Sequence, residues 1–165
     1  MKLYGVAGWK NSGKTGLMER LVTEFTARGL TVSTVKHTHH RVDLDQPGKD
    51  SYRHREAGAQ EVLMVSGSRW ALLHELCDAP EPPFEDLIAR MSPVDLLLIE
   101  GYKTGTHPKI EAHRQVTGKA PFAGDDPTVR ALASDQPEAI VLDRPVFDLD
   151  DTRAIADFIA GDLSL

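Results

Sequence analysis

The 165-residue sequence contains one cysteine, Cys77, so the chain forms no intramolecular disulfide. It has no run of about 18 apolar residues, and no transmembrane helix is therefore expected. Met1-Lys2 leads directly into a strand-like segment, without the apolar region of a signal peptide. Together these absences favour a cytoplasmic protein. No nucleophile motif surrounds Cys77, which we interpret as a residue without a catalytic role.

A cluster of positive charge is also missing. The formal net charge is -6, and the basic residues are scattered along the chain. Binding of nucleic acid without sequence preference requires a clustered positive surface. We therefore expect neither a nucleic acid nor a membrane as partner, and small molecules or other proteins as ligands. The length suits one domain with a substantial core.

One phosphate-binding motif is complete. The stretch GVAGWKNSGKTGL carries Gly8, four further residues, and then Gly13-Lys14-Thr15, which is the spacing of a P-loop. The glycines allow backbone N–H groups to surround a phosphate, and Lys14 is expected to reach the β- and γ-phosphate oxygens. The Thr15 hydroxyl is expected to bind Mg²⁺, and the following helix adds its positive dipole end. We expect residues 1–165 to form a single P-loop nucleotide-binding domain.

The hydrophobic pattern predicts an α/β protein. Apolar residues spaced by three and four follow the P-loop, and a strand-like segment precedes and follows this helix, so the chain begins with a β-loop-α-β unit. We expect a P-loop NTPase-like three-layer fold with a mostly parallel sheet and an additional β-hairpin. The expected strands are Leu3–Ala7, Leu30–Val35, Glu61–Val65, Trp70–Leu76, Val94–Ile99, Lys109–His113 and Ala139–Leu142, and further helices are expected at Ser51–Gly58, Phe84–Met91 and from Asp150-Asp151 onward.

A P-loop requires a second acidic residue on the magnesium side. The segment VDLLLIEGYK offers Asp95 and Glu100 at opposite ends of its apolar run. Ligands of parallel sheets lie beyond the carboxyl ends of the strands, where Glu100 is expected. Asp95 would lie about 17 Å away, at roughly 3.3 Å per residue. We therefore predict Lys14 and Glu100 as the catalytic pair and Asp95 as a residue that begins the strand.

The segment VKHTHHRVDLDQPGKDS is dense in ionisable groups. Lys36 ends the second strand and can face the nucleotide. The favoured hypothesis is a switch-like loop whose acids and Lys49 respond to phosphate and magnesium, with Asp50 a candidate metal ligand beside Thr15 and Glu100. A transition-metal site of His37, His39 and His40 with Asp43, Asp45 and Asp50 is an alternative, although the spacing matches no defined zinc pattern. A plain surface loop is the third reading.

Recognition of the base leaves a weaker signal. The Asn-Lys-x-Asp motif of common GTPases is absent. Asp135 follows a possible short strand and can pair with guanine N1 and N2. Trp9 and Lys10 are unusual within a P-loop; Trp9 either packs over a base or covers the loop. No arginine finger or water-orienting glutamine is recognisable, and because such groups accelerate hydrolysis by roughly 10³ to 10⁵, we expect slow turnover.

Four motifs together resemble one family. They are GWKNSGKT, the VKHTHH and GKDSYRHREAGA stretch, DLLLIEGYK and PKIEAHR, with weaker similarity in ALASD and PVFDLDD. This combination is similar to the molybdopterin-guanine dinucleotide biosynthesis protein B (MobB) family over about residues 3–113. The resemblance implies a homodimer that binds GTP with Mg²⁺, hydrolyses it slowly and assists a MobA-like molybdenum cofactor guanylyltransferase. It leaves open whether molybdopterin itself is bound.

The resemblance also assigns residues. It places Gly8, Lys10, Asn11, Ser12, Gly13, Lys14 and Thr15 at the phosphates, Glu100 on the metal side, and Lys36, Asp50, Arg53 and Lys103 in motifs near the site. Gly16 replaces the second hydroxyl residue of many such loops, so it offers the α-phosphate a backbone N–H alone.

Two other functions remain open. A small-molecule kinase would use the same P-loop, although no lid segment with several arginines is visible. A metallochaperone GTPase would use His37, His39 and His40. The segment Trp70 to Leu76, with apolar residues that look exposed, is a candidate subunit interface.

Overall fold

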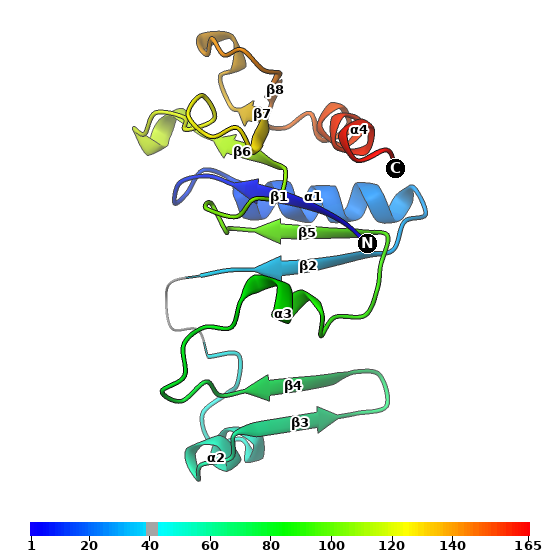
Figure 1. The fold of residues 1–165 in the computed structure, drawn as a ribbon, viewed down its shortest axis with the longest axis vertical. Coiled ribbons are helices and arrows are strands. Elements are labelled where there is room, and N and C mark those ends of the chain that lie inside the picture. Colours follow the sequence, from blue (N-terminus) through cyan, green and yellow to red (C-terminus); the bar gives the residue numbers. More distant parts are fainter. Residues whose placement is uncertain (39–42) are drawn as a thin grey trace. The chain divides into compact units, whose positions relative to one another are not determined.

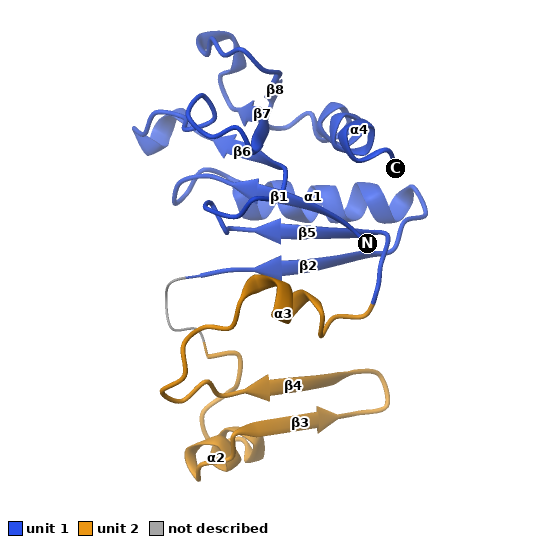
Figure 2. Ribbon diagram, in the orientation of Figure 1, with its two compact units in different colours: residues 1–38, 93–165 blue, residues 39–92 orange. Residues whose placement is uncertain are grey.

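The computed structural model describes residues 1–38 and 43–165 and contains two units (Figure 1; Figure 2). The first unit consists of residues 1–38 and 93–165, and the second lies within residues 39–92. The first unit holds the P-loop and both of the longer helices. Four residues of the histidine-rich segment, His39, His40, Arg41 and Val42, lie outside the described residues.

The first unit is built on a six-stranded sheet in the order β2-β5-β1-β6-β7-β8. Every neighbouring pair is parallel, so all six carboxyl ends lie at one edge of the sheet. The elements are β1 (Lys2–Ala7), α1 (Lys14–Ala27), β2 (Val32–Lys36), β5 (Leu96–Glu100), β6 (Lys109–His113), β7 (Val129–Ser134), β8 (Val146–Asp148) and α4 (Thr152–Leu163), with 3₁₀ turns η1 (Gln115–Thr117) and η2 (Pro137–Ala139).

Burial explains why β1 and β5 are internal strands of the sheet. All five residues of β5 are buried, as its continuous apolar run requires of a strand covered on both faces. It pairs with β2 on one side and β1 on the other. The strand that follows the P-loop helix is therefore separated from β1 by β5. The first strand is therefore an internal strand of the sheet, and the P-loop that follows it begins at the interior of the sheet rather than at an edge strand.

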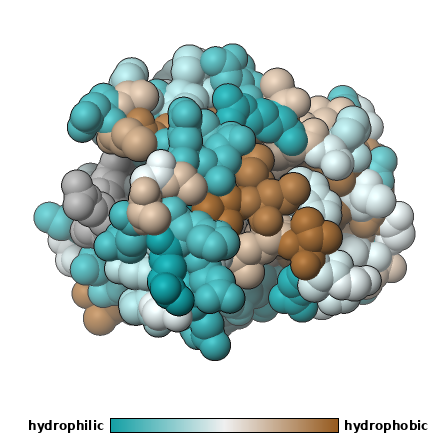
Figure 3. Space-filling view, turned by 90° about the horizontal axis from the view of Figure 1, so that it is seen from below, coloured by the Kyte–Doolittle hydropathy of each residue, from teal (hydrophilic) through white to brown (hydrophobic). Residues whose placement is uncertain are grey.

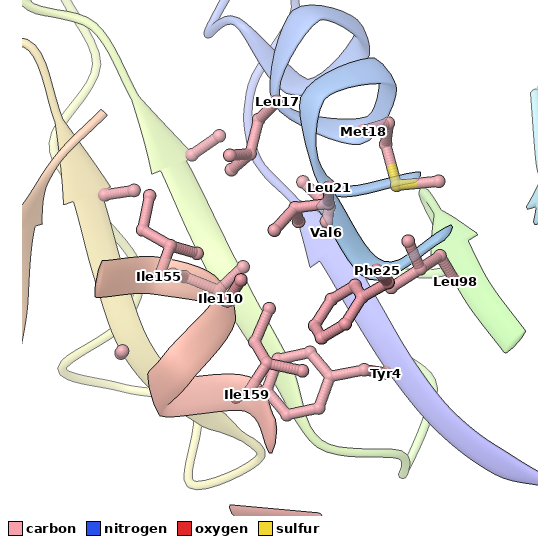
Figure 4. Packing of buried hydrophobic residues seen from close by; sticks show 14 of the residues in the cluster. Tyr4, Val6, Leu17, Met18, Leu21, Phe25, Leu98, Ile110, Ile155 and Ile159 are labelled. Atoms are coloured by element: carbon pink, nitrogen blue, oxygen red, sulfur yellow. The ribbon is translucent and has the colours of Figure 1, made fainter. Parts of the chain in front are cut away.

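The main core lies between the sheet and the two longer helices. Figure 4 shows Leu17, Leu21 and Phe25 of α1 and Ile155 and Ile159 of α4 facing the strand residues. Their spacing of three and four residues gives each helix one apolar face, which is buried here. The sheet residues of this cluster include Tyr4, Val6, Leu98 and Ile110. The P-loop is therefore held between a buried strand and a buried helix.

The second unit contains a separate antiparallel hairpin. Its elements are α2 (Asp50–Glu56), β3 (Glu61–Val65), β4 (Trp70–His74) and α3 (Phe84–Ile88). The Ser66 hydroxyl accepts the backbone N–H groups of Ser68 and Arg69, which stabilises the hairpin turn. Among the apolar hairpin side chains Val62 is buried, whereas Leu63, Val65, Trp70 and Leu72 are exposed. Figure 3 shows hydrophobic surface gathered in one area with hydrophilic side chains around it.

The predicted α/β class, the parallel sheet and the additional hairpin are confirmed. One predicted strand is wrong: Ala139–Leu142 forms no strand. Pro137 begins the turn η2, and Ile140 and Leu142 pack from a loop against a small cluster around Leu132. Within the described residues, no helix is long and apolar enough to cross a bilayer.

Candidate functional site

The candidate site lies at the carboxyl edge of the sheet. Lys36, at the end of β2, is paired in register with Glu100, at the end of β5, and Glu100 is paired with Val6 of β1. The P-loop starts at Gly8, directly after β1. Because neighbouring parallel strands end together, these residues meet although they lie far apart in the sequence. The topology therefore brings both halves of the predicted phosphate site to one place.

The backbone of the P-loop depends on Gly8. A Cβ atom at this position would lie 2.4 Å from both the Ala112 carbonyl oxygen and the Ser12 hydroxyl oxygen. Its φ of 151° also lies in the region that L-residues rarely adopt. Asn11 has a φ of 64°, and Asn is among the side chains that tolerate this region best. The loop thus passes close to β6 at Gly8, where only a residue without a side chain fits.

Lys14 lies across this loop. Its ammonium donates to the carbonyl oxygens of Gly8, at 3.1 Å, and Trp9, at 2.7 Å. Burial lowers the pKa of Lys14, and the carboxylate of Glu100 opposes this lowering. The helix α1 that it begins has neither a side-chain cap nor an acidic residue in its first turn. The positive end of the helix and the ammonium therefore face the same space, and such an end favours an anion.

Thr15 and Glu100 form the second half of the site. The Thr15 hydroxyl donates to Glu100 Oε1 at 3.1 Å, and the Lys36 ammonium lies 3.4 Å from the same oxygen. Hydroxyl and carboxylate oxygens are ligands that Mg²⁺ prefers. The donor set therefore fits the predicted magnesium ion. Asp95 lies at the other end of β5, where its Oδ2 accepts from the backbone N–H and hydroxyl of Thr31 at 2.8 and 2.7 Å.

Asp135 follows β7 directly and is exposed. Its Oδ1 accepts the backbone N–H of Gln115 at 2.9 Å. Two loops that follow neighbouring strands, β6 and β7, are thereby tied together at the same edge of the sheet. The predicted base contact is thus placed on the edge that carries the P-loop.

Other predicted residues belong to the second unit or lie outside the described residues. Asp50 begins α2 and belongs to the second unit, where Arg55 forms ion pairs with Asp43 at 2.8 Å and Asp45 at 3.6 Å. Two of the three histidines of the predicted metal site lie outside the described residues. Within residues 1–38 and 43–165, no group of three or more His, Cys, Asp or Glu side chains is arranged to hold a metal.

Sequence reasoning named Lys103 and Trp9 near the P-loop but missed the cluster that they form with Phe122 and the buried Glu111 behind it. The ammonium of Lys103 lies 3.4 Å from the centroid of the Trp9 ring and 4.1 Å from that of Phe122. Glu111, in β6, is fully buried and accepts the backbone N–H groups of Phe122 and Ala123 at 2.9 and 2.7 Å. Burial raises the pKa of Glu111 to about 7. The sequence feature that could have indicated this cluster is the acidic residue Glu111 within the otherwise strand-like segment KIEAH.

The comparisons with known proteins agree with one another. Residues 3–135 match the model of the family described as molybdopterin guanine dinucleotide synthesis protein B, MobB. The molybdopterin-guanine dinucleotide biosynthesis adapter protein of Escherichia coli is 41% identical over 160 residues, which cover 95% of this chain and 90% of that protein. The adapter protein of the same name from Haemophilus influenzae is 40% identical over 160 residues, covering 95% and 86%.

Solved structures give the same result. The Bacillus subtilis MobB structure superposes with a TM-score of 0.78 at 25% identity, covering 99% of this chain and 98% of that one. A MobB homologue from Bacillus stearothermophilus gives a TM-score of 0.73 at 27% identity, covering 99% of both chains. With a family match that spans most of the sequence and relatives that cover nearly all of it, the chain belongs to the MobB family.

Proposed function

We propose that the protein is a GTP-binding adapter with weak GTPase activity that assists a MobA-like guanylyltransferase in attaching GMP to molybdopterin. The adapter role is taken from the names of the Escherichia coli and Haemophilus influenzae relatives. The observation that supports the nucleotide site is that two features lie at the same edge of the sheet. One is Lys14, bound across the P-loop to the carbonyl oxygens of Gly8 and Trp9, and the other is the hydrogen bond from Thr15 to Glu100. A phosphate site next to a magnesium donor pair is what a nucleoside triphosphate requires.

Each group has a defined task in this proposal. The backbone from Gly8 to Gly16, including Ser12, surrounds the phosphates, and Lys14 supplies a positive charge to the β- and γ-phosphate oxygens. Lys10 and Asn11, both exposed in the same loop, and Lys36, at the end of β2, extend this surface. Thr15 and Glu100 hold Mg²⁺, which neutralises charge on the phosphates when bound.

Guanine recognition is assigned to Asp135. One carboxylate oxygen is engaged by Gln115, and the second oxygen can accept the N1–H or N2–H of guanine. Adenine offers no such donor pair. A site that hydrogen-bonds one base discriminates because the wrong base leaves a polar group unpaired. The proposal therefore predicts GTP binding in preference to ATP.

Asp135→Asn tests this assignment. Asparagine keeps an acceptor for Gln115 but turns an N–H₂ donor toward the base, so the affinity for GTP should fall at least about ten-fold. Calorimetric titration with GTP and with ATP, each with and without Mg²⁺, measures the change. The control is Asp143→Asn, an exposed aspartate paired with the adjacent Arg144. Equal ATP and GTP affinity in the unmodified protein would contradict the proposal and favour the kinase alternative, which acceptor-dependent turnover would then establish.

The homodimer is proposed to form through the hairpin. Leu63, Val65, Trp70 and Leu72 expose apolar side chains on β3 and β4, and exposed apolar patches on a small protein commonly mark protein interfaces. Trp70 is 68% exposed and is the largest of these side chains. Replacing Trp70 and Leu72 together with serine should convert a dimer into a monomer in sedimentation equilibrium. The control is Val116→Ser, an apolar residue of the first unit that is 82% exposed. A monomeric unmodified protein would contradict the proposal.

A further inference from the structure

The Lys103 side chain occupies an unusual place beside the P-loop. It follows the tight turn after β5, where Gly101 and Tyr102 have φ values of 100° and 45°. A Cβ atom on Gly101 would lie 2.9 Å from the His37 carbonyl oxygen, so glycine allows the chain to turn closely past β2. The segment therefore returns toward the P-loop and carries the Lys103 ammonium onto the Trp9 ring.

Two aromatic rings hold this ammonium. Trp9 and Phe122 meet edge to face, with centroids 6.0 Å apart and planes at 89°. The Trp9 indole N–H donates to the Ala120 carbonyl at 3.0 Å, which fixes its ring relative to the loop that carries Phe122. A cation near the faces of two rings is stabilised by their quadrupoles. The rings themselves carry no net charge; burial lowers the pKa of Lys103, and the nearby carboxylate of Glu111 opposes this lowering.

The backbone position of Phe122 is fixed by Glu111. The Oε2 atom of this carboxylate binds the N–H groups of Phe122 and Ala123. Its Oε1 atom is buried and has no hydrogen-bond partner within the described structure. Glu111 is paired in register with Ala7, the last residue before the P-loop. The aromatic pair is therefore anchored to the strand next to β1.

Lys103 and Lys14 lie close enough to interact. The Trp9 residue that carries Lys103 on its ring also accepts the Lys14 ammonium at its carbonyl oxygen. The positive charges of Lys103 and Lys36 both add to the lowering of the Lys14 pKa that burial begins. Three lysines thus converge on a region where Glu100 supplies the opposing charge. Such a concentration of like charge favours a polyanion.

We propose that Lys103 is a second phosphate-binding lysine, held on Trp9 and Phe122 beside the P-loop, that moves to the terminal phosphate when a nucleoside triphosphate binds. The long flexible stem of lysine permits this movement, and a charge-assisted hydrogen bond to phosphate is stronger than a cation–π contact. The proposal rests on the phosphate site described above and does not depend on the identity of the base. It gives the site a means of separating triphosphates from diphosphates.

The test compares four ligands: GTP, GDP, ATP and ADP, each with Mg²⁺. Lys103→Met keeps the length of the stem and removes the charge. It should weaken triphosphate binding about ten-fold or more and diphosphate binding less than about three-fold, because one charge-assisted hydrogen bond to the terminal phosphate is lost. Lys103→Arg should restore most of the triphosphate affinity. The matched control is Lys2→Met, an exposed lysine at the opposite end of β1.

A second readout follows Trp9 directly. In a Trp70→Phe background Trp9 is the single tryptophan of the chain. Its fluorescence should change more with triphosphate than with diphosphate, and Lys103→Met should remove that difference. Equal loss of triphosphate and diphosphate affinity, or unchanged affinity for both, would overturn the proposal. A Lys103 effect of equal size on ATP and GTP would support it, and equal affinities of the unmodified protein for ATP and GTP would contradict only the guanine specificity. Absence of any nucleotide binding to the unmodified protein would overturn both.

Discussion

Replacing Lys14 with alanine is expected to abolish nucleotide binding while leaving the fold intact. The Lys14 ammonium lies across the P-loop, bound to the carbonyl oxygens of Gly8 and Trp9. Loss of two charge-assisted hydrogen bonds to phosphate oxygens should weaken binding of GTP by roughly 100-fold or more. The measurement is calorimetric titration of GTP in the presence of Mg²⁺.

The same variant should unfold almost as the unmodified protein does. Lys14 is half-buried at the first position of α1, where alanine is a strong helix former. The free energy of unfolding should therefore change by about 1 kcal/mol or less, as measured by urea denaturation. Lys2→Ala, at the exposed start of β1, is the control for removal of one positive charge. GTP affinity within a few-fold of normal in Lys14→Ala would refute the assignment of the P-loop.

Replacing Glu100 with glutamine is expected to lower magnesium-dependent hydrolysis by about 100-fold, more than it lowers GTP binding. Glutamine retains an acceptor for the Thr15 hydroxyl, so the local structure should persist. The carboxylate charge that favours the metal is lost, and Lys36 loses its partner at 3.4 Å. Rates of phosphate release at saturating GTP, measured over a range of Mg²⁺ concentrations, provide the test.

Binding without Mg²⁺ separates the metal role from a structural one. Since Glu100 repels phosphate oxygens when no cation lies between them, Glu100→Gln should bind GTP at least as tightly as the unmodified protein under these conditions. Asp95→Asn is the matched control, because this carboxylate lies at the opposite end of the same strand and contacts Thr31. Unchanged hydrolysis in Glu100→Gln would move the metal role to another acid, such as Asp43 or Asp50.

The sequence predictions that agree with the structure were based on local patterns, namely motif spacing and runs of apolar residues. The spacing of Gly8, Gly13, Lys14 and Thr15 fixed the P-loop, and the apolar run before Glu100 identified a central strand. The choice of Glu100 over Asp95 required only the direction of that strand. The structure places Glu100 at the Thr15 hydroxyl and Asp95 at Thr31. The wrong prediction of a strand at Ala139–Leu142 shows the limit of such patterns. Apolar residues in a loop can pack against a sheet, and their sequence then resembles that of a buried strand.

Non-local contacts explain what the sequence left out. Trp9 is separated by about a hundred residues from Lys103 and from Phe122, and no spacing rule joins the three. In the sequence, Glu111 is one acidic residue in a short strand. Its structural role depends on the loop that carries Phe122 and Ala123, whose backbone N–H groups donate to its carboxylate. Asp43 and Asp45 were predicted as acids of a switch-like loop or of a transition-metal site, whereas in the structure Arg55 pairs with both of them in the second unit.

The sequence by itself therefore determined the phosphate motif, the α/β class, the hairpin and the acid that faces Thr15. These features follow from short periodic patterns and from the direction of single strands, both of which can be read directly from the sequence. Only the tertiary structure decided the order β2-β5-β1-β6-β7-β8, and with it the side chains that meet beside the P-loop. Strand order depends on which buried faces pack best together, and that choice is made between segments distant in sequence.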